Sequence, residues 1–555
     1  MSPDGADINR GIYKQKGGFV KKYALRLSAT ALAIVALSVV SVWAQNPPAG
    51  SPVAVHGQLS VVGNRIVGQH GNPVQLRGMS LFWSQGRTAR NFYNAATVSH
   101  LASNWQSSVV RAAMGVEEVF SSDEQPYLYD QNANKQRVLN VVAAARTSGI
   151  YVIIDWHSHI AENYQSEAIS FFREMAQMFN GVPNVIYELY NEPIGPGKAF
   201  TNDPAAYWQT IKPYMQAVTN AIRQYDQNNI ILIGNPNWCQ HPDIAAADSV
   251  VGNNLAYTFH FYAAELANGN TGPGPSPAHT SELRLRVAKA MQAGKAVFAS
   301  EIGSVGANGS GTHNAAQTDT WMQFMDSFNI GWAAWALHSS PQTSAALTSG
   351  DANNPNGWNL STTGNYMRNK LITASSAPTF YAIKLNVVGE GQATVSHGAT
   401  TSSPFVDVST TPTVSLLAQA ASGWTFAGWS GDFTGPPQFQ SSFSLANLTG
   451  RTDGQLEITA TFTSPFSAEH QAAPGAARWS VRRADGGLAV SGPSGGAADV
   501  VFYDIRGRVA RRLSVSGGGS AAASSVKIPA GNYMVVVKDR SSGREVYRSR
   551  VLMVK

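Results

Sequence analysis

The sequence predicts an α/β protein: a (β/α)8 barrel followed by two small all-β modules. Short apolar runs alternate eight times with amphipathic stretches of helical period, which favours a barrel while leaving a doubly wound sheet open. After residue 380 the pattern changes to alternating apolar and polar residues rich in Thr, Ser and Gly. After residue 478 basic residues accumulate, which indicates a separate third module.

The alternation locates the elements of the barrel. Strands are expected at residues 74–79, 108–114, 150–156, 184–190, 229–234, 255–262, 296–301 and 330–337. Helices are expected at residues 135–148, 166–179, 205–225, 281–293 and 315–328, with a closing helix at 362–372. Gly-Asn turns within residues 55–74 predict a hairpin that plugs one end of the barrel.

Composition divides the chain into modules. Residues 1–44 hold six Lys/Arg, an apolar run and a small residue at Ala44, as in a signal peptide cut after that residue; a single membrane anchor is the alternative. The expected organisation of the rest is a linker at 45–54, the catalytic barrel at 55–373, a linker at 374–379, an all-β module at 380–463, a linker at 464–477 and a basic β-rich module at 478–555.

Charge and cysteine content exclude several classes of protein. The whole chain carries +6, residues 1–44 carry +4 and residues 478–555 carry +9, so residues 45–477 carry −7. An acidic body with a distant basic tail and no nucleic-acid motif argues against a nucleic-acid enzyme. The lone Cys239 excludes an internal disulfide and a paired-cysteine metal site.

Polar and aromatic residues gather where the expected strands end, which is where barrel enzymes carry their chemistry. Six of the eight strands contribute. In chain order these residues are Arg111, His157, Asn191 and Glu192, His260 and Tyr262, Glu301, and Trp335. The sequence therefore predicts one polar cleft lined by aromatic side chains.

Two carboxyl groups across a cleft suit the cleavage of glycosidic bonds. One carboxyl group protonates the leaving oxygen while the other attacks the sugar or activates a water, and the sequence leaves both spacings open. As the acid, Glu192 needs a raised pKa, whereas Glu301 must stay ionised, for which Arg111 is the natural cation. Asn191 is placed to hold a sugar hydroxyl.

The remaining candidates concern sugar binding and metal. Trp335, Trp238 and Trp83 are candidate platforms for sugar rings, with a place in the core as the alternative. His157 and His159 have the spacing of metal ligands, but the sequence offers no matching third ligand. No metal and no cofactor are therefore expected.

These motifs resemble glycoside hydrolase family 5, and in particular its bacterial endo-β-1,4-glucanases. The likeness runs in order over about 320 residues. It is carried by residues 56–61, 76–80, 110–114, 155–157, 190–193, 258–263 and 300–303, and by Trp335. The resemblance implies a TIM barrel, a retaining reaction, Glu192 as acid/base and Glu301 as nucleophile. It also implies a supporting role for Arg111, His157, Asn191, His260, Tyr262 and Trp335.

The sequence departs from this family at two places. The nucleophile of the family is usually followed by Trp-Gly, whereas Ile302 precedes Gly303 here. After the eighth strand these glucanases usually carry a Ser-Asp-Lys-x-Glu run, which residues 338–342 lack. The departures leave the catalytic residues in place and bear on the preferred substrate.

The expected function is that of a secreted, monomeric endo-β-1,4-glucanase acting on cellulose or a related glucan. Related activities on mannan, xyloglucan or lichenan are the near alternative, and a glycan-binding surface protein with an inactive barrel is the distant one. Residues 502–508 and 528–533 resemble C-terminal sorting domains, which implies contact with secretion machinery or the cell surface. No nucleic-acid partner is expected.

Overall fold

The computed structural model describes residues 46–266, 277–375, 378–397, 405–407, 413–435, 438–445, 448, 453–463, 480–484, 487–491, 497–503, 508–516, 531–540 and 545–553. The expected signal peptide and the whole expected linker at 464–477 lie outside these residues. Among the described residues, no helix combines the length and apolar character needed to cross a membrane. The chain divides into a larger unit that contains the barrel and a smaller unit near the C-terminus.

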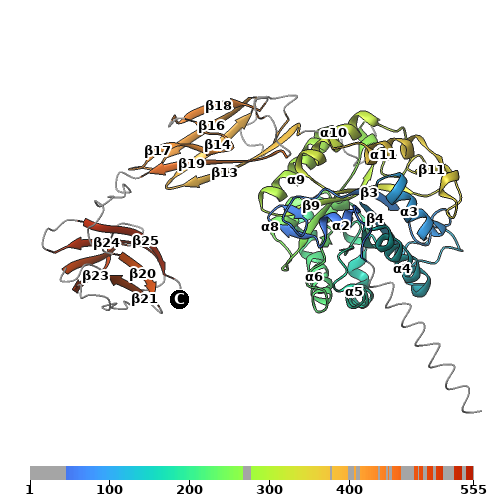
Figure 1. The fold of residues 1–555 in the computed structure, drawn as a ribbon, viewed down its shortest axis with the longest axis horizontal. Helices are drawn as coiled ribbons and strands as arrows, with labels where there is room; N and C mark the ends of the chain where they lie inside the picture. Colours follow the sequence, from blue (N-terminus) through green and yellow to red (C-terminus); the bar gives the residue numbers. More distant parts are fainter. Residues whose placement is uncertain are drawn as a thin grey trace, which may run out of the picture. The chain divides into compact units, whose positions relative to one another are not determined.

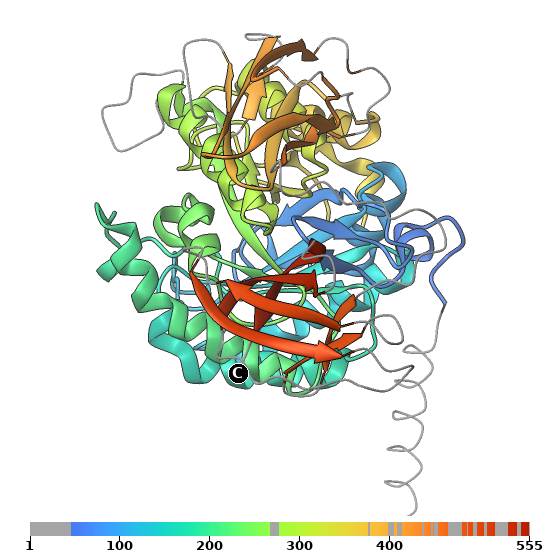
Figure 2. The same cartoon turned by 90° about the vertical axis from the view of Figure 1, so that its left-hand side faces the viewer.

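Eight parallel strands close into a barrel in the order β10-β3-β4-β5-β6-β7-β8-β9, as the sequence predicts. Helices surround the ring of strands (Figures 1 and 2). The strands are β3 (Arg77–Leu81), β4 (Val109–Gly115), β5 (Tyr151–His157), β6 (Val185–Glu188), β7 (Ile231–Ile233), β8 (Leu255–Tyr262), β9 (Ala296–Gly303) and β10 (Trp332–Leu337). The main helices are α3 (Ala95–Asn104), α4 (Gln131–Ser148), α5 (Gln165–Phe179), α6 (Pro204–Arg223), α8 (Pro242–Ala247), α9 (Pro277–Gln292), α10 (Ala315–Phe328) and α11 (Thr362–Ile372).

Local sequence signals begin and end the helices. The side chain of Asp130 accepts a hydrogen bond from the third residue of α4, and Gly149 ends that helix in the left-handed conformation. Asn314 and Asn329 do the same for α10. These caps hold the helix ends in register with the strands that follow them.

The expected hairpin is present, with one difference. Strands β1 (Ser60–Val62) and β2 (Arg65–Val67) pair antiparallel around the Gly63-Asn64 turn. Residues 52–56, which were expected to form the end of the linker and the start of the β-like stretch, form the short helix α2 (Pro52–His56) instead. Ser51 caps this helix and Pro52 fixes its first turn, so these local signals outweigh the β-branched residues between them.

The barrel interior changes from apolar to polar along the strands. The deeper inward-facing side chains form one buried apolar cluster that includes Val109, Ile153, Ile186 and Phe298. Two residues further along each strand stand Arg111, Asp155, Glu188 and Ser300, all of them buried. Because side chains alternate between the two faces of a strand, this period of two delivers the polar groups to the carboxyl-terminal mouth.

The module after the barrel consists of two packed sheets, ordered β15-β13-β19-β17 and β14-β16-β18. The strands are β13 (Phe380–Val388), β14 (Gly391–His397), β15 (Phe405–Asp407), β16 (Thr413–Ala420), β17 (Thr425–Gly431), β18 (Gln440–Ser444) and β19 (Gln455–Thr463). Trp429 is buried against Phe426, so it is a core residue of the module. Phe380 packs edge-on against Phe324 of α10, which ties the module to the barrel.

The C-terminal unit is also built from strands. A four-stranded antiparallel sheet has the order β23-β22-β24-β25, and β20 pairs with β21. The strands are β20 (Ser480–Ala484), β21 (Gly487–Ser491), β22 (Ala497–Tyr503), β23 (Val509–Ser516), β24 (Gly531–Asp539) and β25 (Glu545–Met553). The expected all-β character after residue 380 is therefore confirmed.

Replacing Trp321 by Ala tests the packing of α10 on the barrel. The indole is buried and stacks on Phe261 of β8 with ring centroids 4.2 Å apart. Loss of a buried indole costs about 3–5 kcal/mol. Urea unfolding followed by helical circular dichroism measures the barrel, since the described helices lie between residues 52 and 372. The exposed Val251→Ala is the control, and a Trp321→Ala cost within about 0.5 kcal/mol of it would contradict this packing.

Candidate active site

The two candidate catalytic glutamates lie close together at the mouth of the barrel. An oxygen of Glu192, an oxygen of Glu301 and a ring nitrogen of His260 all lie within 4.8 Å of one another. Both glutamates are buried, with 8% and 4% of their surface exposed. Retaining glycosidases place their carboxyl groups about 5–5.5 Å apart, and inverting ones about 6.5–9.5 Å apart to admit a water. Of the two spacings that the sequence left open, the structure has the shorter one.

Glu192 lies just past the end of β6, where the chain still runs beside β5. The backbone nitrogens of Asn191 and Glu192 donate to the carbonyl oxygens of Trp156 and Ser158 at 3.2 and 3.3 Å. The thiol of Cys239 donates to the carbonyl oxygen of Asn191 at 3.1 Å, so this lone cysteine supports the same turn. The polar pair is thereby fixed although it lies outside a regular strand.

An irregularity in β9 brings Glu301 into the cleft. Thr258 pairs with Phe298 and His260 pairs with Glu301, so two steps along β8 match three steps along β9. Such a bulge changes which face of the sheet the following side chains occupy. As a result both Ser300 and Glu301 reach the polar cluster, although adjacent residues of a regular strand face opposite ways.

Arg111 joins the carboxylates at the base of the cleft. Its guanidinium is fully buried and lies 3.0 Å from Oε2 of Glu301, 2.7 Å from Oε2 of Glu188 and 3.0 Å from Oδ2 of Asp155. It also donates to the amide oxygen of Asn191 at 2.6 Å. Burial disfavours the charged guanidinium, but the three carboxylates outweigh this and raise the pKa of Arg111. The arrangement keeps a permanent cation beside Glu301.

Glu301 has a second partner in Tyr262, whose hydroxyl donates to Oε1 at 2.5 Å. Each carboxylate oxygen of Glu301 therefore accepts from a different group. Burial, followed by the charge of Glu301, raises the pKa of Tyr262 well above its usual value, so the phenol stays protonated. The two contacts hold the Glu301 carboxylate in one orientation, as attack by a nucleophile requires.

Glu192 is held between two histidines. Nδ1 of His260 lies 2.8 Å from Oε1, and Nε2 of His159 lies 3.3 Å from Oε2. Burial works toward a higher pKa, but the contacts with His159 and His260 outweigh it and lower the pKa of Glu192. The expectation of a raised pKa is therefore not met in the free enzyme, because the contacts with His159 and His260 favour the ionised form of Glu192.

His157 is a fixed neutral ring in the wall of the cleft. Burial lowers its pKa well below the usual value, with Arg111 adding to the effect. Nδ1 lies 2.6 Å from Oδ2 of Asp155, whose own pKa burial raises to about 7. Trp335 stacks on the imidazole at 5.1 Å and Trp83 meets it edge-on at 4.1 Å. These contacts place both tryptophans beside the catalytic pair.

Trp238 occupies a different part of the cleft surroundings. Its backbone nitrogen donates to the carbonyl oxygen of Pro193, next to Glu192, and its half-buried ring stacks on the exposed Phe200 at 6.2 Å. Its backbone is left-handed, in the short turn α7 (Pro236–Cys239) after β7. The structure therefore groups Trp83 and Trp335 around His157, and Trp238 with Phe200.

The sequence did not indicate the site roles of Asp155, Glu188, Ser300 and His159. Oγ of Ser300 donates to Oε1 of Glu188 at 2.6 Å and lies 2.9 Å from Nε2 of His260, so it links two site residues. The alternation in β6 could have identified Glu188, since it stands two residues after the inward-facing Ile186. His159 had been considered only as a metal ligand.

Ile302 and His338, two positions at which the sequence departs from the family pattern, are buried, whereas residues 341–342 of the second departure are exposed. Ile302 is fully buried among the apolar side chains between the strands and the helices. His338 is buried behind the cleft, where it stacks on Phe82 at 4.1 Å and contacts Oγ1 of Thr88. Burial lowers the pKa of His338 to about 4, so the ring is neutral. Ile302, in β9, and His338, directly after β10, are therefore packing residues of the barrel.

Within the part of the chain that the structure describes, two groups of side chains have the spacing of metal ligands: Glu192, His260 and Glu301, and Glu117, Glu118 and His159. In both groups a protein cation already faces the carboxylates. The guanidinium of Arg111 lies 3.0 Å from Glu301, and the ammonium of Lys198 lies 3.7 Å from Glu117 and contacts Glu118. The positive charge that a metal would supply is thus present in the side chains.

A (β/α)8 barrel with two buried carboxyl groups this close at its mouth defines a glycoside hydrolase. Residues 67–341 match the family described as Cellulase (glycosyl hydrolase family 5). Endoglucanase Z of Dickeya dadantii strain 3937 is 40% identical over 333 residues, which cover 60% of this chain and 69% of the relative. The chain belongs to glycosyl hydrolase family 5.

Other relatives agree. An endoglucanase of Clostridium saccharobutylicum is 37% identical over 335 residues, covering 58% of this chain and 68% of the relative. A solved structure from Cytophaga hutchinsonii is 38% identical with a TM-score of 0.51, covering 58% of this chain and 96% of that chain. The catalytic domain of a Thermobifida fusca endoglucanase in complex with cellotetraose is 27% identical with a TM-score of 0.50, covering 58% and 100%. The similarity covers the barrel.

Replacing Arg111 by Gln tests the cation at the base of the cleft. The change leaves three buried carboxyl groups without their cation, for which a cost of about 3–5 kcal/mol in unfolding free energy is expected. Loss of the partner of Glu301 is expected to lower kcat/KM by about 100-fold or more. Urea unfolding and hydrolysis of cello-oligosaccharides measure the two effects.

The control is Arg90→Gln, since Arg90 pairs with Asp123 at the surface with N and O 3.5 Å apart. Its stability is expected to stay within about 0.5 kcal/mol of the parent protein. Equal stability of the Arg111 and Arg90 variants would contradict the role given to the buried cation.

Proposed function

We propose that the barrel hydrolyses internal β-1,4-glucosidic bonds of cellulose or a related glucan, with retention of anomeric configuration. The observation that carries the proposal is the close approach of Glu192 and Glu301, with oxygens within 4.8 Å. A gap of this size suits direct attack of one carboxylate on the sugar carbon and leaves no room for the water of an inverting reaction. The relatives named endoglucanase support the choice of bond.

In the first half of the reaction Glu301 attacks the anomeric carbon. Arg111 and Tyr262 hold its oxygens at 3.0 and 2.5 Å, which fixes the direction of attack. Glu192 gives a proton to the glycosidic oxygen as the bond to the leaving sugar breaks. The product of this half is a glycosyl ester on Glu301 and a shortened chain.

In the second half Glu192 accepts a proton from a water molecule while the oxygen of that water attacks the anomeric carbon of the ester. Glu301 then leaves as the carboxylate, stabilised again by Arg111. Arg111 takes the amide oxygen of Asn191, so the NH2 group is what this side chain offers to a sugar hydroxyl. Such a contact would strengthen as positive charge develops on the ring.

The aromatic residues favour a polysaccharide substrate. Trp83 and Trp335 flank His157 beside the catalytic pair, and Trp238 with the exposed Phe200 lies beyond Pro193. Apolar rings bind the faces of pyranoses, and rings near both His157 and Pro193 suit a substrate longer than one sugar. In this structure Trp83 and Trp335 are each 6% exposed, so they would offer ring edges rather than open faces. A cellotetraose complex of a relative supports a glucan substrate. The proposed enzyme acts as a monomer.

Glu192→Gln and Glu301→Gln test the catalytic pair. Each variant is expected to lose activity on carboxymethylcellulose by about 1000-fold or more, since each removes one half of the reaction. Reducing-sugar release and viscosity are measured together, and an endo-acting enzyme lowers viscosity early. Glu174→Gln is the matched control, because Glu174 pairs with Lys135 on the surface.

The same experiment distinguishes substrates and stereochemistry. Activity confined to mannan, xyloglucan or lichenan would keep the mechanism and change the substrate, whereas inactivity on all four polymers would favour a glycan-binding protein. Proton NMR of the first product is expected to show the β-anomer. Early appearance of the α-anomer would overturn the retaining reaction.

The proposal also includes export. The basic and apolar residues of 1–44 support a cleaved signal peptide, and the basic module at 478–555 supports contact with secretion machinery or the cell surface. Expression with this leader in a secreting bacterium is expected to yield enzyme in the medium whose N-terminal residue is Gln45. A membrane-bound product that keeps residues 1–44 would indicate an anchor instead.

A further inference from the structure

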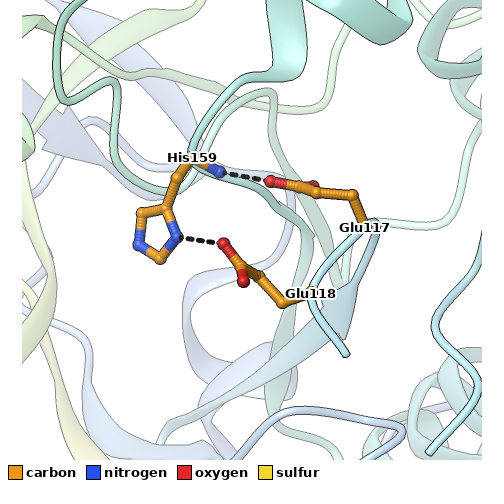
Figure 3. A group of neighbouring side chains, drawn as sticks. All are labelled: Glu117, Glu118 and His159. Carbon is orange, nitrogen blue, oxygen red and sulfur yellow. Dashed lines mark hydrogen bonds and ion pairs between the residues drawn. The ribbon is translucent and has the colours of Figure 1, made fainter. Parts of the chain in front are cut away.

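His159 contacts Glu192, the proposed acid/base, and is not among the residues to which the family resemblance gives a role. The residue follows β5, two positions after His157. Nε2 lies 3.3 Å from Oε2 of Glu192, and Nδ1 lies 3.3 Å from Oε1 of Glu118. The backbone nitrogen donates to Oε1 of Glu117 at 3.1 Å. Figure 3 shows the imidazole and its backbone nitrogen each facing one of the two glutamates that follow β4.

The contacts of Glu117 and Glu118 hold the ring in place. Lys198, in the turn η3 (Pro196–Lys198) after β6, contacts Glu118 and lies 3.7 Å from Glu117. The indole of Trp83 lies 5.8 Å from the imidazole centre, and His157 lies 6.4 Å away. Segments after three strands therefore orient His159 so that one ring nitrogen faces an acidic partner and the other faces Glu192.

We propose that His159 is a positioning residue that shares one proton with Glu192, so that the pair stores the proton used in each catalytic cycle. This inference rests on the proposed function of Glu192 as acid/base. In the free enzyme the proton resides on Nε2 and Glu192 is ionised. To act as an acid, Glu192 must first be protonated. This takes a single proton transfer from Nε2 of His159 to Oε2 of Glu192, which lie 3.3 Å apart.

The proton balance over a cycle is closed. The N–H bond of His159 breaks and an O–H bond forms on Glu192, which turns an ion pair into a neutral pair. The carboxyl group then protonates the glycosidic oxygen, whose bond to the anomeric carbon breaks with its electron pair on that oxygen while Glu301 bonds to the carbon. In the second half, water gives a proton to Glu192, which returns it to His159 as the hydroxyl joins the anomeric carbon and Glu301 leaves.

The charges around the pair favour one stored proton over a wide pH range. Burial opposes the imidazolium, but the contacts with Glu118 and Glu192, with Glu117 adding to them, raise the pKa of His159 to about 10. The contact with Nε2 of His159 in turn lowers the pKa of Glu192. Two groups coupled this strongly titrate as a pair, so the shared proton leaves only near the raised pKa.

Other charged groups face the pair from every side. Nδ1 of His260 contacts Glu192 from β8, while Asp155, from β5, interacts electrostatically with both members. Lys198 contacts Glu118, so its positive charge acts on the imidazole through that carboxylate. Glu118 is therefore the group whose removal should lower the proton affinity of His159 without touching Glu192.

The test is the pH profile of kcat/KM for cellotetraose with the full chain, His159→Asn and Glu118→Gln. The parent enzyme should keep its activity until the pair loses its proton. In His159→Asn the proton must reside on Glu192 alone, so the alkaline limb is expected to move down by about one pH unit or more. Glu118→Gln should move the limb in the same direction by a smaller amount.

A substrate with an activated leaving group separates this role from a structural one. 2,4-Dinitrophenyl β-cellobioside needs no proton on its leaving oxygen, so kcat/KM of His159→Asn for it is expected to stay within about 2-fold of the parent enzyme. A loss of equal size on both substrates would mean that His159 only supports the fold. This comparison also shows that the variant has a folded site.

An unmoved alkaline limb in His159→Asn, with both substrates still hydrolysed, would overturn the inference. The proposed function has a different failure. If the parent enzyme hydrolyses neither substrate, or if Glu192→Gln keeps full activity on cellotetraose, then Glu192 is not the acid/base of a glucanase. The two results are distinguishable in one set of profiles.

Discussion

The buried guanidinium of Arg111 is the group on which the rest of the site depends. It stands among three carboxyl groups and an amide, all close enough for direct contact. Burial raises the pKa of Asp155 to about 7 and raises that of Glu188, which favours their neutral forms. The cation thus holds the carboxylate of Glu301, the proposed nucleophile, in position.

The two catalytic glutamates share a cleft but have different electrostatic neighbours. Glu301 contacts groups that stay in one protonation state, a guanidinium and a phenol. Glu192 contacts two imidazoles, whose ring nitrogens can both donate and accept a proton. A fixed environment suits a nucleophile that must remain ionised, and an exchangeable one suits a group that alternates between acid and base. Glu188 and Ser300 connect the two environments through His260.

How much of the site could be predicted depends on how regular the backbone is. Arg111 and His157 lie on regular strands, so the barrel rule placed their side chains at the mouth. The period of two also predicts that Glu188 faces inward. It is the last residue of β6 and precedes the polar pair Asn191 and Glu192, on which the sequence analysis was based. Ser300 also follows the period of two, since it stands two residues after Phe298. His159 could not be assigned from spacing, because it lies outside a strand and its partner Glu118 lies in a segment distant in sequence.

The sequence alone determined the fold class, the strands that carry the chemistry and the two glutamates, because hydrophobic periodicity and strand ends are local properties. The tertiary structure decided the rest. Whether Glu301 faces the cleft depends on the bulge that lets two residues of β8 pair with three of β9, and a one-residue shift would reverse its side chain. The approach of the two glutamates to within 4.8 Å and the contact of His159 with Glu192 likewise arise only when separate strands close into a barrel.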